Sequence, residues 1–171
     1  MENVVLVDEQ DKQLGLMEKM EAHEKGLLHR AFSVFIFDES GNMLLQQRAE
    51  SKYHSPKLWT NACCSHPRDG ETVLEAATRR LQEEMGFVCD IEKSFDFIYK
   101  AELDQGLTEH EFDHVLIGKY EGKIARNPDE VMEYKYVPMD ELLMDVDKNA
   151  ENYTVWFKVA LPTLIEKLGW V

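Results

Sequence analysis

The chain has 171 residues, of which 44% are hydrophobic and 30% charged, as is typical of one soluble globular domain with its own buried core. A net charge of −14 argues against nucleic acid or an anionic membrane as a partner, but it leaves room for a small anion held by a local basic cluster. No apolar run has the length of a membrane span, and three cysteines cannot form a closed disulfide framework. We therefore expect a cytoplasmic single domain over residues 1–171, as a monomer or weak dimer.

The first part of the chain alternates strand-like segments with one short helical segment. In chain order we expect a strand at 4–8, a helix at 17–25 ended by Gly26, a strand at 31–37 and, after a turn at 38–42, a strand at 43–48. The segment 31–37 is almost continuously apolar, which favours a strand covered on both faces. His23 lies on the expected helix, and His29 lies just after Gly26.

A local basic cluster follows in this otherwise acidic chain. Its members are Arg48, Lys52, Tyr53, His54 and Lys57. The cluster is compatible with a solvated loop and with an anion site, and on its own it favours the loop.

Residues 59–67 place two thiols and an imidazole within four positions. If residues 58–64 form a strand, Cys64 and His66 point to one face and Cys63 points to the other, toward the core. Pro67 ends the strand because it cannot donate to a sheet ladder. A thiol beside an imidazole is compatible with acid–base chemistry or with a metal site, although a buried Cys pair followed by a surface His would give the same pattern.

The clearest helix is expected over residues 72–85, with Thr72 as N-cap and Gly86 just past its end. The residues expected to form its buried stripe are Val73, Leu74, Ala77 and Leu81. Arg80, Glu83 and Glu84 should share a polar neighbourhood at helical spacing.

Two further strands are expected at 95–103 and 108–120, with Phe95, Phe97 and Tyr99 on one face of the first. Glu109 and Glu111 fall on one face of the second, about 7 Å apart. Two carboxylates so close need a cation or a raised pKa if they point into a cleft. On a solvated edge strand they would be unremarkable.

The chain ends with an expected strand at 131–137, a short helix through Met144 and a terminal helix over 153–168 with a broad apolar face and Pro162 as an expected kink. Strands alternating with helices predict an α/β (α+β) fold with a mixed central sheet sandwiched between helices.

Five candidate metal ligands are dispersed along the chain: His23, His29, His66, Glu109 and Glu111. Three imidazoles and two carboxylates suit Mn²⁺ or Mg²⁺ better than a closed four-ligand Zn²⁺ site, with Zn²⁺ as an alternative. Spacing alone does not show that they converge.

Residues 65–87 resemble a Nudix box, with Glu71, Glu83 and Glu84 at its positions. Ser65 stands where the box has Gly, and Arg80 stands where it has a Glu that helps to bind the catalytic metal of Nudix hydrolases. Together with Trp-Thr-Asn-Ala-Cys-Cys-Ser-His-Pro before the box and Thr-Glu-His-Glu after it, the chain is similar to the type I isopentenyl diphosphate isomerases of Nudix-like α/β/α fold. The similarity extends from about Val4 to Trp156.

That resemblance implies a role for each matching residue. One divalent ion would be bound by His23, His29, His66, Glu109 and Glu111, and protons would be transferred by Cys64 and Glu111, with Tyr99 beside Glu111. Glu84 would hold a Mg²⁺ ion that bridges to the substrate diphosphate, and that diphosphate would be contacted by Lys19, Arg48, Lys52 and Arg80. Trp156 would form a wall of the isoprenoid pocket.

The implied activity is interconversion of isopentenyl and dimethylallyl diphosphate in isoprenoid biosynthesis. A Nudix hydrolase of nucleoside diphosphate derivatives is the second hypothesis, disfavoured by Arg80 and by histidines that the box does not need. A non-catalytic metal or nucleotide-binding module is the third, disfavoured because Cys64, Tyr99 and Glu111 are all present.

Overall fold

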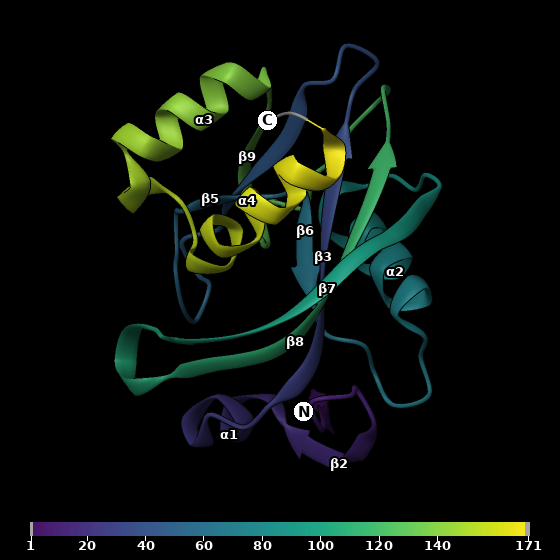
Figure 1. The fold of residues 1–171 in the computed structure, drawn as a ribbon, viewed down its shortest axis with the longest axis vertical. Coiled ribbons are helices and arrows are strands. Elements are labelled where there is room, and N and C mark those ends of the chain that lie inside the picture. Colours follow the sequence, from purple (N-terminus) through teal and green to yellow (C-terminus); the bar gives the residue numbers. More distant parts are fainter. Residues whose placement is uncertain (1, 170–171) are drawn as a thin grey trace.

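In the computed structural model, which describes residues 2–169, one mixed sheet lies between helices on its two faces (Figure 1). Helix α2 covers one face, and α3 and α4 lie toward the other (Figure 1). This arrangement confirms the predicted fold class. None of the helices in the described range is long and apolar enough to cross a membrane.

The helices and strands follow one another closely along the chain. In order they are β1 (Asn3–Val7), β2 (Gln13–Glu18), α1 (Lys19–Lys25), β3 (His29–Phe37), β4 (Met43–Arg48), β5 (Trp59–Thr60), β6 (Cys63–Ser65), α2 (Val73–Met85), β7 (Ile91–Glu102), β8 (Thr108–Lys119), β9 (Val131–Val137), α3 (Met139–Lys148) and α4 (Val155–Leu168), with 3₁₀ turns at Asp104–Gly106 and Ala150–Asn152.

Strand β3 is the centre of the sheet, as its apolar run predicts. It pairs in parallel with β8 along its whole length and antiparallel with β6 in its middle. Its start contacts β1 and its end contacts β4. Because β3 has neighbours on both edges and helices on both faces, nearly all of its side chains are buried.

Alternation along β3 and β8 divides the core into two clusters. Phe32 and Leu116 pack in the cluster with α2, whereas Phe35 and Val115 pack in the cluster with α4. Odd-numbered positions of both strands therefore belong to the α4 face of the sheet. His29, Glu109 and Glu111 all have odd numbers, so the fold directs them to that face.

Helix α2 begins and ends as predicted. The Thr72 side chain accepts a hydrogen bond from the Glu75 amide, and Gly86 has a left-handed φ of 73°. A Cβ at Gly86 would lie 2.3 Å from the Ala125 carbonyl oxygen, so only glycine fits this close approach. The prediction that Leu74 is buried is wrong, because it faces outward and is 50% exposed while Ala76 occupies the inner face.

Several predicted boundaries also differ from the structure. The helix expected from residue 17 begins at Lys19, since residues 13–18 form β2, a strand that was not predicted, which pairs with β1. The single strand expected over 58–64 is two short strands, because residues 61–62 leave the ladder. Strand β7 begins earlier than expected, α3 continues to Lys148, and α4 begins at Val155.

Candidate active site

The cysteine pair is split between the two faces of the sheet, as alternation predicts. Cys63 is fully buried in the cluster with α2, and Cys64 lies on the α4 face. The break at residues 61–62 is stabilised by Asn61, whose side-chain amide donates to the carbonyls of Val34 (2.9 Å) and Cys63 (3.0 Å). The Asn61 side chain thus fixes the backbone immediately before the thiol.

The Cys64 thiol is held by contacts on three sides. Trp156 of α4 donates its indole N–H to Sγ at 3.0 Å, the Asn61 Oδ1 atom lies 3.0 Å away, and the Ser33 hydroxyl lies 3.5 Å away. Burial, and then the negative charge of Asp113, raise the pKa of Cys64 above its ordinary value. At neutral pH the sulfur therefore keeps its proton, as a proton donor must.

Glu109 and Glu111 are brought together on the buried face of β8, and the Tyr99 hydroxyl on β7 contacts both carboxylates. Its distance to Glu111 Oε1 is 2.7 Å. Burial, and then the neighbouring Glu111, raise the pKa of Glu109. Burial alone would raise the pKa of Glu111 too, but its contacts with His29 and His66 outweigh burial and hold that pKa low.

His23 and His29 each present one free ring nitrogen to this carboxylate pair. The Nδ1 atom of His23 donates to the Lys19 carbonyl (2.7 Å), and that of His29 donates to the Leu27 carbonyl (2.9 Å). Their Nε2 atoms are buried and have no hydrogen-bond partner among the described residues. A backbone acceptor on one ring nitrogen and a free lone pair on the other is the usual arrangement of a metal-binding histidine.

His66 completes the group, with Nε2 2.9 Å from Glu111 Oε2. Burial lowers its pKa to about 4, so the ring is neutral at physiological pH and can act as a ligand. The ligand atoms of His23, His29, His66 and Glu111 lie within 4.8 Å of one another. This donor set, with two buried lone pairs free, fits a divalent metal ion.

His54 also reaches this cluster, although it was not among the predicted ligands. It is 3% exposed, and its Nε2 lies 3.4 Å from Glu109 Oε2. With His23 and Glu109 it forms a second compact group of ligand atoms that overlaps the first. In the sequence analysis His54 was assigned to the local basic cluster, and no local pattern marked it as a metal ligand.

The four predicted diphosphate contacts, Lys19, Arg48, Lys52 and Arg80, all line the same cavity as Cys64, His66, Glu109, Glu111 and Trp156. They come from different elements: α1, β4, the loop after β4, and α2. The Nε atoms of Arg48 and Arg80 are buried donors with no acceptor in the described part of the chain. The cavity therefore has a cationic region next to the His/Glu cluster.

Glu84 contacts Arg80 but is not among the residues that line the cavity, and it is only 3% exposed. Its carboxylate accepts from Arg80 Nη2 (2.7 Å) and from Gln46 Nε2 (3.0 Å), and it contacts the Cys63 thiol. The predicted polar neighbourhood of Arg80, Glu83 and Glu84 is confirmed, but Glu84 is buried on the α2 face.

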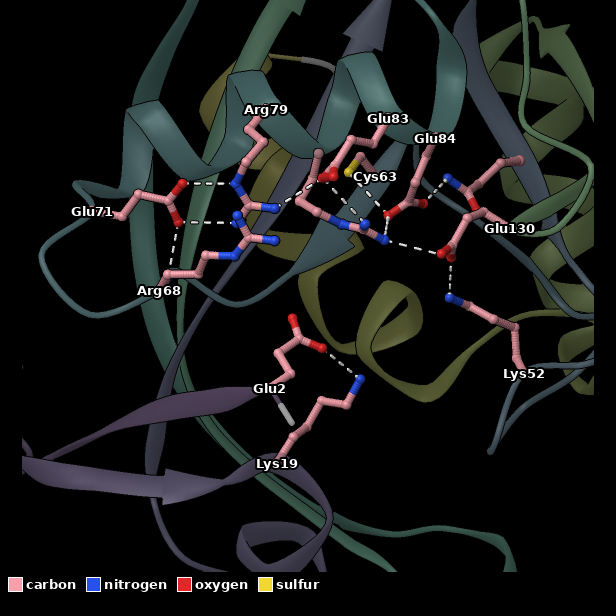
Figure 2. A network of polar contacts seen from close by, with 12 residues as sticks. Glu2, Lys19, Lys52, Cys63, Arg68, Glu71, Arg79, Glu83, Glu84 and Glu130 are labelled. Atoms are coloured by element: carbon pink, nitrogen blue, oxygen red, sulfur yellow. Dashed lines mark hydrogen bonds and ion pairs between the residues drawn. The ribbon is translucent and has the colours of Figure 1, made fainter.

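Two carboxylates that were not predicted also line the cavity: Glu2 and Glu130. Glu2 pairs with Lys19 at 2.9 Å, and Glu130 pairs with Lys52 (Figure 2). Glu130 also lies 3.5 Å from Arg80. Nothing in the local sequence distinguished either residue from a solvated acidic side chain.

Comparison with known proteins agrees with this geometry. The family described as NUDIX domain matches residues 27–157. Among solved structures, the protein DR0079 from Deinococcus radiodurans superposes with a TM-score of 0.71 at 18% identity, covering 86% of this chain and 90% of that one. A MutT NUDIX hydrolase from Burkholderia pseudomallei superposes with a TM-score of 0.60 at 16% identity, covering 79% and 96%. These two likenesses define the fold class.

Curated relatives are much closer in sequence. Isopentenyl-diphosphate Delta-isomerase 2 of Aromatoleum aromaticum is 48% identical, covering 96% of this chain and 87% of the relative. Isopentenyl-diphosphate Delta-isomerase 2 of Photorhabdus laumondii is 52% identical, covering 92% and 89%. The chain therefore belongs to the isopentenyl-diphosphate Delta-isomerase family of NUDIX-domain proteins.

Proposed function

We propose that residues 1–171 act as one domain that interconverts isopentenyl and dimethylallyl diphosphate, with Cys64 and Glu111 as the proton-transfer pair. The observation that supports this assignment most directly is that both residues line one cavity together with Trp156 and four cationic side chains. Moving a double bond by one carbon requires a proton to be added at one carbon and removed from another. The reaction therefore needs at least one acid and one base in the active site.

The two groups have complementary protonation states. The Cys64 thiol keeps its proton because burial raises its pKa, whereas Glu111 is ionised because His29 and His66 hold its pKa low. In one direction Cys64 can add a proton to the alkene while Glu111 accepts one, and the reverse direction exchanges these roles. Tyr99 is proposed to position Glu111 through its hydroxyl, which lies 2.7 Å from Oε1.

Trp156 is proposed to form the wall of the isoprenoid pocket and to stabilise the tertiary cation between the two proton transfers. Its indole contacts Cys64 through Nε1, and its ring faces the Arg48 guanidinium at 5.1 Å. A ring that already attracts a cation can attract a carbocation in the same way, worth about 2 kcal/mol when desolvated. His54 packs edge-on against the same ring.

Lys19, Arg48, Lys52 and Arg80 are proposed to bind the diphosphate, since all four line the cavity. Binding of the diphosphate end holds the alkene between the acid and the base, and this positioning lowers the barrier to proton transfer. We further propose that Glu84 acts through a Mg²⁺ ion that accompanies the diphosphate. Its contact with Arg80 supports this, because Arg80 lines the cavity.

The site residues proposed to hold the second ion, Mn²⁺ or Mg²⁺ with Zn²⁺ as an alternative, are His23, His29, His66, Glu109 and Glu111. When bound, such an ion supplies positive charge that stabilises the carboxylate form of Glu111 and Glu109. His23 and His29 would contribute their free Nε2 atoms.

Incubation of the purified protein with isopentenyl diphosphate and Mg²⁺ tests the proposal, with allylic diphosphate and released phosphate measured in the same sample. Isomerisation predicts the allylic product and no phosphate. Phosphate release without the allylic product would instead identify a hydrolase. A nucleoside diphosphate derivative serves as the parallel substrate for that second candidate.

A further inference from the structure

The cationic region of the cavity is already largely neutralised by the chain's own carboxylates. Lys19 pairs with Glu2, and Lys52 pairs with Glu130 (Figure 2). Arg80 pairs with Glu84 and Glu130. Of the four cations, only Arg48 has no ion pair among the described residues. Four positive and three negative charges leave a net of one positive charge.

Glu130 differs from the other two carboxylates in its position. It lines the cavity and pairs with both Lys52 and Arg80, two of the cations proposed to bind the diphosphate. Glu84 is not among the residues that line the cavity, and within residues 2–169 Glu2 forms an ion pair only with Lys19. The Glu130 side chain is 25% exposed, and its ion pairs keep its pKa below the ordinary value although burial opposes this.

The backbone holds Glu130 firmly in this place. Its amide donates to the Asn127 carbonyl (3.0 Å), and its carbonyl accepts from the Ala49 amide (3.1 Å) at the end of β4. The Asn127 amide in turn donates to the Glu84 carbonyl in α2 (2.8 Å). This turn thus connects the two elements that carry Arg48 and Arg80, and it keeps the Glu130 backbone beside the cavity.

We infer that Glu130 makes the cavity select a diphosphate complexed with a divalent cation over the free diphosphate. A free diphosphate would bring its negative charge against the Glu130 carboxylate, and like charges placed together at a binding site weaken binding. A diphosphate that carries Mg²⁺ presents a cation to the same carboxylate, and Mg²⁺ commonly binds one or two carboxylates together with phosphate oxygens. This inference rests on the proposed diphosphate substrate and adds a residue to its recognition.

Binding of inorganic pyrophosphate by isothermal titration calorimetry tests the inference, in buffer without added Mg²⁺ and in excess Mg²⁺. The measured quantity is the dissociation constant without Mg²⁺ divided by the dissociation constant in excess Mg²⁺. For Glu130→Gln we expect this ratio to fall by about tenfold or more, through tighter metal-free binding, weaker Mg²⁺-dependent binding, or both. Glu133→Gln removes the same charge from an exposed position on β9 and should leave the ratio at its wild-type value.

Glu130→Asp separates charge from folding, because it keeps the carboxylate on a shorter side chain. We expect it to retain most of the wild-type selectivity, and equal loss in Asp and Gln variants would overturn the inference. An unchanged ratio in Glu130→Gln would overturn the inference alone. Wild-type protein that binds pyrophosphate under neither condition would overturn the diphosphate site itself, and the inference with it.

Discussion

The two ends of the cavity, the His/Glu cluster (the first end) and the cationic region (the second end), differ in how far their charges are paired within the chain. The His/Glu cluster has two buried histidine nitrogens with no hydrogen-bond partner in the described part of the chain, and two carboxylates lie side by side on a strand, so it is incomplete without a cation. The cationic region has its charges almost fully paired within the chain. One end therefore attracts its ion strongly, and the other accepts its ligand only by exchanging existing ion pairs.

The difference follows from where the residues lie. Most ligands of the His/Glu cluster come from β3 and β8, whose ladder fixes His29 opposite Glu111. The cations come from α1, the end of β4, the following loop and α2, with long side chains that can move. A rigid site suits a permanently held ion, and a set of exchangeable pairs suits a substrate that must leave.

The largest expected effect lies between the two ends, at the thiol. Cys64→Ala should lower the isomerisation rate by about 10³-fold or more, because a positioned proton donor contributes on this scale. Cys63→Ala is the matched control: its side chain packs on the opposite face, and much of the activity should remain. Steady-state assays on both variants, with folding checked by circular dichroism, measure this. Equal losses in two folded variants would contradict the assignment.

Metal retention tests the first end. His29→Ala removes an unpartnered Nε2 ligand, and Glu109→Gln removes a carboxylate charge, so each should lower divalent-ion affinity by at least about 100-fold. Elemental analysis of protein purified without chelator measures the occupancy. His110→Ala, on the opposite alternation of β8, should keep its ion. Wild-type protein that holds no metal, with activity independent of added metal, would refute the cluster as an ion site.

Mg²⁺ dependence tests the second end. Glu84→Gln should raise the Mg²⁺ concentration for half-maximal rate and the substrate KM, each by about tenfold, while the His/Glu ion stays in place. A Mg²⁺ titration of the rate, together with elemental analysis, separates these outcomes. A titration curve that overlays the wild-type curve would mean that Glu84 serves only as the partner of Arg80.

The smallest expected effect concerns an ion pair outside the cavity, between Glu71 and Arg79. Two Glu71 oxygens accept from Arg79 at 2.7 and 2.9 Å, and this pairing lowers the Glu71 pKa below its usual 4.5. Glu71→Gln should cost about 0.5–1 kcal/mol of unfolding free energy at neutral pH. Because the folded pKa is lowered, this stabilisation is present above pH 4.5 and is lost as the pH falls through the folded value.

Urea denaturation of wild type and Glu71→Gln at neutral and acidic pH measures that difference. The Mg²⁺ titration of Glu71→Gln should match wild type, in contrast to Glu84→Gln. A Mg²⁺ titration of Glu71→Gln that differs from the wild-type curve would contradict the assignment of a purely structural role to Glu71.

Much of the fold could be predicted from local sequence. The apolar run of β3, the capped helix α2 and the alternation that separates Cys63 from Cys64 all have direct physical signals, and the structure agrees with them. Strand β2 was missed because it is mostly exposed and its pairing with β1 depends on a register that no local pattern encodes.

The convergence of the site could not be predicted from spacing, because it depends on the parallel pairing of strands that are distant in the sequence. Family resemblance named five ligands, and the structure brings all five to one cavity region. His54 and Glu130 were missed for a different reason. Each follows residues typical of solvated loops, and only the folded chain shows that they face the cavity.

The parallel ladder between β3 and β8 has a consequence for insertions and deletions. Since a strand alternates faces at every residue, deleting a single residue from β8 beyond Glu111 would shift its frame against β3 and turn both carboxylates away from the α4 face. Every ligand would still be present in the gene, yet the site would be gone. Strand length is thus as much a part of this centre as the identity of its ligands.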